Sequence, residues 1–377
     1  MNYPIKYIEN NLVFNHEGEC FAYFELLPYN YSFLTPEQKL QVHTNFRQLI
    51  AQNREGKIHA LQISTERSIR SIQEKSKETV TGRLKDIAFQ RIDEQTEALV
   101  NMIGDNQVDY RFFIGFKLLV NEEEVSLKNL KKSAKNTLTT FFREVNQKWM
   151  GDFFVMPQDE VRRYTKMADL LQAKIERRFH IRPLDKNDFG YLIEHLYGKE
   201  TSSFEEYEFP LPLKKLKHQT LVKRYDLLKP TRSLIEENQR YLKIQNEETT
   251  SYVAYFTIDS IVGELDFPSN EIFYYQQQQF DFPIDTNMNI EIVANKKALS
   301  TVRNKKKELK DLDDHAWNSD NETGNNVLEA LEDVNELEAE LDQTKEAMYK
   351  LSYVIRVAAS SYEELKRRCN EIKDFYD

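Results

Sequence analysis

The chain has 377 residues, and its size alone suggests two or three domains rather than one. Hydrophobic residues make up 40% and aromatic residues 12%, which excludes a wholly disordered protein, and the ten glycines and ten prolines are too few for folds built on phosphate-binding loops or propeller blades. The net charge of −10 gives no electrostatic reason to expect a general nucleic-acid coat.

Cysteine use and hydropathy indicate the compartment. Two cysteines, Cys20 and Cys369, are typical of a reducing compartment, with one disulfide between them as the alternative. Residues 1–6 lack the apolar core of a signal peptide. The most apolar windows, such as 112–120, are far shorter than the roughly 20 residues of a membrane-spanning helix. We therefore expect a soluble, cytoplasmic protein whose membrane association would come through a partner.

The first 150 residues begin with the pattern of a β-hairpin. Aromatic-rich runs at 11–14 and 20–26 flank a polar turn that contains Gly18. Thr35, Pro36 and Gln38 then start a helix that should end near residue 53. The other elements expected here are a strand at 58–63, a helix at 66–103 that Gly82 could break, a strand at 110–120 and a helix at 126–148.

Residues 151–232 have the pattern of a mainly helical region. We expect one helix at 160–179, with an apolar stripe on one face, and a second at 185–197 with Asp185 as its cap. Residues 201–212 are the segment most typical of a flexible loop, because they combine acidic residues with prolines.

Residues 233–377 recapitulate the order of elements of the first 150. The expected elements are a hairpin at 241–245 and 252–258, a helix at 270–279, a strand at 289–293 and two charged helices at 296–314 and 327–347. Alternating apolar residues at 349–357 then predict a strand with one buried face. Ser361 and Glu364 form a capping box for the last helix.

This recurrence sets the predicted architecture. Matching elements lie about 230 to 240 residues apart, as in an internal structural repeat, with chance recurrence of common α+β patterns as the alternative. We expect an α+β fold of two mainly antiparallel sheets covered by helices. The first sheet belongs to 1–150, a helical middle occupies 151–232, and the second sheet with a projecting pair of charged helices belongs to 233–377.

No combination of residues identifies an active site. The nearest approach to a nucleotide-binding loop is Gly198-Lys199, but Glu200 follows it and Ile193 occupies the place of the first glycine. The sequence has no dinucleotide-binding glycine pattern and no hydrolase nucleophile elbow. No two histidines have His-x-x-x-His spacing, and neither cysteine has another nearby. Catalytic, cofactor-binding and metal-binding residues are therefore left unassigned.

Two basic clusters stand out against the acidic average. The first is a candidate surface for contact with phosphates or an anionic membrane. It consists of Lys214, Lys215, Lys217, Lys223, Arg224, Lys229 and Arg232. The second lies at 296–310 on a predicted helix. The plainer alternative for both clusters is a solvated helix face.

Three parts of the sequence resemble the TraC-like conjugation ATPases of type IV secretion systems, above all those of Gram-positive conjugative transposons and integrative elements. They are NLVF and ECFAYFEL within 11–26, residues 185–198, and YKLSYVIRV leading into SYEEL within 349–365. In this family a similar strand and capped helix precede the motor domain. The resemblance covers essentially the whole chain as scattered short stretches, with no catalytic motif among them.

The resemblance implies an N-terminal docking and assembly domain. The sequence reaches Asp377 before any Walker motif, so we expect the RecA-like motor, with its ATP and Mg²⁺, outside this region and no enzymatic activity or cofactor within it. The implied partners are membrane channel subunits and sister subunits at the inner face of the cell membrane, met through the charged helices at 296–347. The alternatives are a module that contacts transported DNA through the cluster at 214–232, and a stand-alone enzyme.

Overall fold

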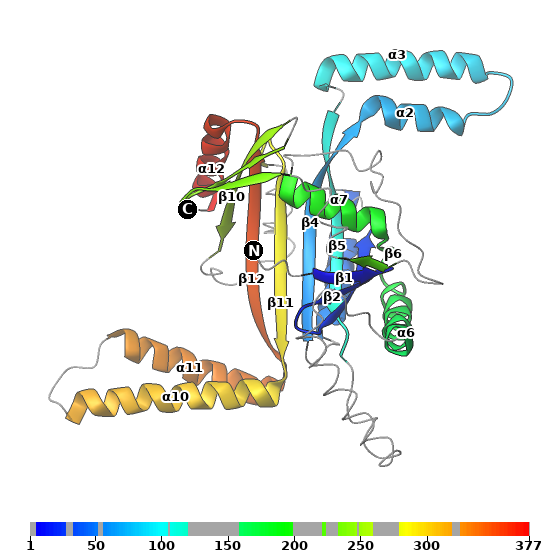
Figure 1. Cartoon of the computed structure of the whole chain (residues 1–377). Coiled ribbons are helices and arrows are strands. Elements are labelled where there is room, and N and C mark those ends of the chain that lie inside the picture. Colours follow the sequence, from blue (N-terminus) through cyan, green and yellow to red (C-terminus); the bar gives the residue numbers. More distant parts are fainter. Residues whose placement is uncertain are drawn as a thin grey trace. The chain divides into compact units, whose positions relative to one another are not determined.

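A single β-sheet organises the chain in the computed structural model (Figure 1). The structure describes residues 5–27, 33–51, 56–104, 106–119, 158–198, 221–223, 233–246, 249–258, 279–318 and 325–376. The strands are β1 (Ile5–Glu9), β2 (Leu12–Asn15), β3 (Cys20–Leu26), β4 (Gly56–Ser68), β5 (Asn106–Lys117), β6 (Ile181–Pro183), β7 (Leu221–Lys223), β8 (Leu234–Glu237), β9 (Leu242–Gln245), β10 (Thr250–Thr257), β11 (Ile284–Val293) and β12 (Met348–Ala359). The helices of the described residues are α1 (Pro36–Ala51), α2 (Ile69–Glu78), α3 (Lys85–Ile103), α6 (Gln158–Ile175), α7 (Lys186–Gly198), α10 (Asn295–Asn318), α11 (Asn325–Thr344) and α12 (Tyr362–Tyr376).

The sheet is mostly antiparallel and open. Its strand order is β7-β1-β2-β3-β5-β4-β11-β12-β10-β9-β8, and β6 pairs with β3 in addition. The α+β class is therefore confirmed. The sequence predicted two sheets and the structure has one, because β4 and β11 are neighbours and connect the strands of both halves. Such pairing satisfies backbone groups that two separate sheet edges would leave exposed. The predicted internal repeat is not confirmed.

The first predicted hairpin and the helix that follows it are confirmed. β2 pairs with β3 across a turn in which Gly18 has a φ of +82°, a conformation that glycine adopts without strain. Asn15 Oδ1 closes the turn by accepting a hydrogen bond from Glu19 N at 2.8 Å. α1 begins with the expected capping box, because Gln38 N donates to Thr35 Oγ1 at 3.3 Å and Thr35 N donates to Gln38 Oε1 at 2.9 Å.

The helix predicted at 66–103 is two helices. β4 continues to Ser68, and the Ser68 hydroxyl then caps α2 by accepting from Ser71 N at 3.2 Å. Gly82, with a φ of +107°, lies between α2 and α3, so the break expected there is confirmed. The predicted start at Glu66 was wrong because pairing in the sheet keeps the polar end of β4 extended against its local preference.

Most later elements have the predicted type and differ only at their ends. Asp185 caps α7, with its Oδ1 accepting from Asp188 N at 3.0 Å, and Ser361 caps α12, with its hydroxyl accepting from Glu364 N at 3.3 Å. The hairpin of β9 and β10 is also as predicted. Both cysteines are free thiols. The predictions at 126–148, 201–212 and 270–278 lie outside the described residues.

β12 does not have the alternation of burial that was predicted along its length. Tyr353 and Ile355 are buried, whereas Tyr349 and Leu351 are exposed. Arg356 is also buried, although its side chain belongs to the opposite face from that of Ile355. The single buried face predicted for the whole strand is therefore wrong, because the second half of the strand is covered on both faces.

The chain divides into two compact units. Unit 1 contains residues 1–32, 60–287 and 353–377, and unit 2 contains residues 33–59 and 288–352. Each unit is assembled from separate parts of the sequence. The division into consecutive regions at 1–150, 151–232 and 233–377 stays a prediction.

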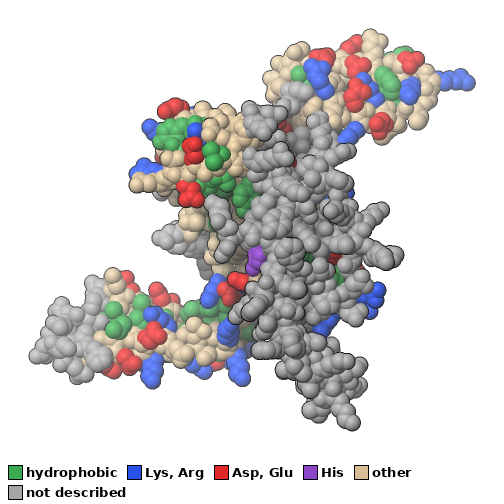
Figure 2. All heavy atoms as spheres, viewed as in Figure 1, with side chains coloured by type: hydrophobic (Ala, Val, Ile, Leu, Met, Phe, Trp, Pro, Cys, Tyr) green, Lys and Arg blue, Asp and Glu red, His purple; other side chains and the backbone are tan. Residues whose placement is uncertain are grey.

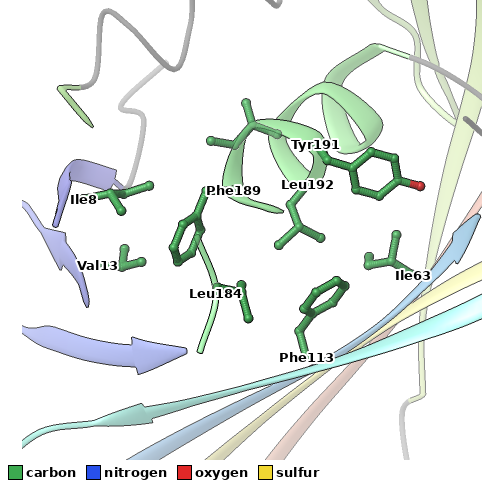
Figure 3. Close-up of a cluster of buried hydrophobic side chains, with 9 residues drawn as sticks. Ile8, Val13, Ile63, Phe113, Leu184, Phe189, Tyr191 and Leu192 are labelled. Atoms are coloured by element: carbon green, nitrogen blue, oxygen red, sulfur yellow. The ribbon is translucent and has the colours of Figure 1, made fainter. Parts of the chain in front are cut away.

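The core of unit 1 holds α7 on the sheet. Its buried apolar cluster comes from β1, β2, β4, β5 and α7 with the segment before α7 (Figure 3). The members are Ile8, Val13, Ile63, Phe113, Leu184, Phe189, Tyr191, Leu192 and Ile193. Complete burial of one such large aliphatic or aromatic side chain contributes about 1.5–3 kcal/mol. This packing fixes the position of the charged side chains that α7 also carries.

Candidate functional site

The candidate surface predicted from the first basic cluster lies almost entirely outside the described residues. Lys223 is the last residue of β7. The members outside the described residues are Lys214, Lys215, Lys217, Arg224, Lys229 and Arg232. This surface therefore stays a prediction. The second basic cluster lies on α10.

Unit 1 contains a buried network of two arginines and two carboxylates. Arg111 on β5 donates to both oxygens of Glu25 on β3, from Nε at 2.7 Å and from Nη2 at 2.9 Å. Arg111 Nη2 also donates to Asp188 Oδ1 of α7 at 3.0 Å. Arg182 completes the network with hydrogen bonds of 2.8 and 2.7 Å to the two oxygens of Asp188. The network therefore connects two neighbouring strands, β6 and a helix.

The electrostatics of this network keep its aspartate ionised. Burial by itself would raise the pKa of Asp188, but hydrogen bonds from Arg182 and the backbone of Asp185 outweigh this effect and lower it. Hydrogen bonding to Asp188 in turn raises the pKa of Arg182. Both groups therefore stay charged across the physiological range.

The network borders a cavity of about 520 Å³. The charged residues that line it are four bases and four acids. They are Arg67, Lys75, Arg111, Arg182, Glu25, Glu66, Asp185 and Asp188. Because the two signs balance, the lining offers no net attraction to an anion or a cation. The ion pairs around Asp188 join β3, β5, β6 and α7 beside this cavity.

A second buried cluster in unit 1 is centred on Asp285 of β11. Ser64 of β4 donates to Asp285 Oδ1 from its backbone N at 2.8 Å and from its hydroxyl at 2.7 Å. His195 Nε2 of α7 lies 2.8 Å, and Arg356 Nη1 of β12 lies 2.5 Å, from Asp285 Oδ2. Burial would raise the pKa of Asp285, but the charge and hydrogen bond of His195, together with Arg356, hold it well below its usual value.

This second cluster contains serine, histidine and aspartate but not the arrangement of a catalytic triad. In a triad the serine hydroxyl donates to the histidine, whereas here the Ser64 hydroxyl donates to Asp285. An ionised carboxylate only accepts, so His195 Nε2 carries the proton of the 2.8 Å contact. The Ser64 and His195 side chains are almost completely buried. The cluster holds three strands to α7.

Neither buried cluster was predicted from the sequence, although some of their charged residues stand within or beside apolar runs. Glu25 is the single charge of β3, Arg356 is the single charge of the apolar run 353–359, and Arg111 directly precedes the apolar run 112–116. A charge in such a position is almost never buried unless it is paired. What the sequence does not indicate is which residue supplies the partner, since Glu25 and Asp188 come from distant parts of the chain.

α2 and α3 form a helical hairpin that extends from the ends of β4 and β5 (Figure 1). Ion pairs connect the two helices: Lys77 Nζ lies 2.5 Å from Asp93 Oδ1, and Arg70 forms a bidentate pair with Glu97. The Lys77 ammonium also lies over the ring of Phe89. Polar contacts between the helices therefore support this hairpin.

The same hairpin exposes large apolar side chains. Met102 is 79% and Leu84 is 69% exposed. The exposed members are Ile72, Leu84, Ile87, Leu99, Met102 and Ile103. Single exposed apolar residues are ordinary, but several on one narrow element are typical of a surface that a protein partner covers.

α10 and α11 form a second hairpin, in unit 2, between β11 and β12. Val302 and Leu341 belong to its buried apolar core. Further out, Glu338 of α11 accepts from Arg303 Nε at 2.8 Å and from Lys306 Nζ at 2.7 Å of α10. Hydrogen bonds from Lys306 and Arg303 lower the pKa of Glu338. Most exposed side chains of α10 and α11 between 296–310 and 329–342 are charged, and Leu312 and Leu328 are exposed as well.

Metal sites and membrane spans can be assessed for the described part of the chain. Within it, no three or more His, Cys, Asp and Glu side chains are grouped so that they could share a metal ion. None of the helices described there has the length and apolar content to cross a membrane. In the comparisons with known proteins, no family model and no curated protein matches the chain.

Proposed function

We propose that this chain is a docking and assembly domain, without catalysis of its own, of a type IV secretion ATPase that drives conjugative DNA transfer. It holds the motor to membrane channel subunits and to sister subunits at the inner face of the cell membrane. The family assignment is supported by the sequence resemblance at 11–26, 185–198 and 349–365. ATP and Mg²⁺ belong, in this proposal, to the motor domain.

The observation that carries the docking role is the pair of helical hairpins. Each is inserted between two strands of the sheet, and each exposes side chains along its length. α2–α3 offers apolar side chains to a partner, and α10–α11 offers charges. The buried clusters around Asp188 and Asp285 support the same role, because they fix the strands from which a hairpin can transmit force.

We further propose that the chain contains an internal repeat within its single sheet. The strand order supports this, since it is symmetric about its centre: β4, β5, β3, β2 on one side and β11, β12, β10, β9 on the other. α2–α3 connects β4 to β5 as α10–α11 connects β11 to β12. In this proposal the two hairpins occupy equivalent positions in the repeat. Their surfaces differ, so we expect them to bind different partners.

The test is the frequency of DNA transfer by the native conjugative element. β4 and β5 are neighbours in the sheet, so a short Gly-Ser linker can replace residues 70–104 without separating them. We expect this deletion to abolish transfer, while circular dichroism shows a folded chain and the full-length protein still hydrolyses ATP. Normal transfer frequency with this deletion in place would reject the proposal.

The alternative function, contact with the transported DNA, makes a separate prediction. Binding through the cluster at 214–232 should depend strongly on salt and should be lost when Lys214, Lys215 and Lys217 are changed to Glu. Absence of DNA binding at low salt would reject this alternative and leave the docking proposal in place.

A further inference from the structure

We infer that the α10–α11 hairpin of one copy of this chain docks on the same hairpin of a second copy, with the acidic face of α11 against the basic face of α10. The inference rests on the proposed docking function and names the partner of this arm as a sister subunit. It uses only residues of unit 2.

The outer face of α11 is a continuous acidic stripe. The helix contains seven acidic and no basic residues. Six of the acids are exposed, and five of these recur at three- and four-residue spacing, which places those five on one face. They are Glu329, Glu332, Asp333, Glu336 and Glu340. Carboxylates at this spacing repel one another, so cations from outside the hairpin stabilise the stripe.

The outer face of α10 has the opposite charge. Between residues 296 and 310, α10 has seven basic residues against one acid, Glu308. Arg303 and Lys306 are used within the hairpin, because they pair with Glu338. Lys296, Lys307 and Lys310 are exposed. Lys and Arg side chains line one edge of this hairpin (Figure 2).

Lys296, Lys307 and Lys310 lie on one side of the helix. Their spacing of eleven and three residues returns them to one face, away from the buried Val302 and Leu309. α10 therefore presents a basic stripe to a partner and an apolar stripe to α11.

The two stripes match in length as well as in sign. At 1.5 Å per residue, the acidic stripe from Glu329 to Glu340 is about 17 Å long and the basic stripe from Lys296 to Lys310 is about 21 Å long. Each copy carries one stripe of each sign on different helices, so the acidic stripe of one copy meets the basic stripe of the next. Such a heterologous contact repeats from copy to copy and generates a ring or a filament. A second copy of the chain is the partner that offers both an acidic and a basic stripe of matching length.

The test is sedimentation velocity of the purified full chain and of charge-reversal variants. We expect the wild type to assemble at 50 mM salt and to dissociate at 500 mM, since screening weakens exposed charge pairs. E332K/E336K/E340K makes both stripes basic, and K296E/K307E/K310E makes both acidic, so each variant alone should be monomeric. A mixture of the two should assemble, and so should a single chain with all six changes.

A matched control changes three exposed bases elsewhere. R163E/K166E/K174E on α6 alters the net charge as much as K296E/K307E/K310E does, and it should leave assembly unchanged. A wild type that stays monomeric at 50 mM salt overturns the inference, and so does a folded six-residue variant that fails to regain assembly. Neither result affects the transfer assay with the α2–α3 deletion, so the inference and the proposed function can fail separately.

Discussion

Arg356 on β12 and Arg367 on α12 both pair with aspartates, but the Arg356 side chain is 4% exposed and that of Arg367 is 44% exposed. Removing one partner of a buried ion pair leaves an uncompensated buried charge. When the pair is exposed, water solvates the charge that remains. We expect R356M to lower the free energy of unfolding by about 3–5 kcal/mol. The matched variant R367M should lower it by less than about 1 kcal/mol.

Urea unfolding of both variants followed by circular dichroism checks this prediction. Equal losses of stability in R356M and R367M would show that the Asp285 cluster does not hold the strands.

The strand that contains Arg356 could be predicted from the sequence. Its partner Asp285 is 71 residues away, and local patterns carry no information about such a pairing.

Asp188 makes the stability of unit 1 dependent on pH. The folded chain holds the pKa of Asp188 below its ordinary value, so the folded state stays ionised at a pH where the unfolded chain has bound a proton. The stabilisation is therefore complete above the unfolded pKa of about 3.9 and is lost as the pH falls through the folded pKa. Asp285 acts in the same direction.

The measurement is the free energy of unfolding at several pH values from 7 to 3. The wild type should lose stability steeply below about pH 4. D188N is less stable at pH 7 and should show a shallower decline, because its amide does not titrate. An identical slope in the wild type and in D188N would contradict the assignment.

At the scale of single elements, the pairing of β3 with β5 depends on a glycine. Gly115 lies opposite Tyr23, and a Cβ added at Gly115 would lie 2.5 Å from the Tyr23 ring. We expect G115A to destabilise the chain by about 1–3 kcal/mol, because the buried ring has to move. Thermal unfolding of G115A, Y23L and the double variant checks this. If the loss of stability in the double variant equals the sum of the losses in the two single variants, the Cβ at position 115 does not clash with the Tyr23 ring.

Elements with strong local signals could be predicted from the sequence. The capping box at Thr35, the hydroxyl cap at Ser361, the hairpin around Gly18 and the break at Gly82 depend on neighbouring residues only, and each is present. The short strands β1, β6 and β8 were not predicted, since they have little pattern of their own and form by pairing with longer strands. β4 was predicted too short for the same reason.

At the scale of the whole molecule, the recurrence of elements was visible in the sequence but the number of sheets was not. Whether two groups of strands make one sheet depends on the pairing of β4 with β11, and neither strand carries a local signal for that neighbour. The residues of the candidate site were likewise predictable only where the signal is local. The α10–α11 pair and its charges could be predicted, whereas α2–α3 was predicted as one helix and the buried clusters depend on contacts between distant residues.

We propose that this chain docks a conjugation motor to its membrane channel. Site-specific photocrosslinking in mating cells tests it most directly, with the photoreactive residue at Met102 on the exposed α3 surface and a control at Lys174 on α6. The account predicts that position 102, and not position 174, crosslinks to a channel subunit of the inner membrane. Channel crosslinks of equal yield from both positions, or none from position 102, would contradict it.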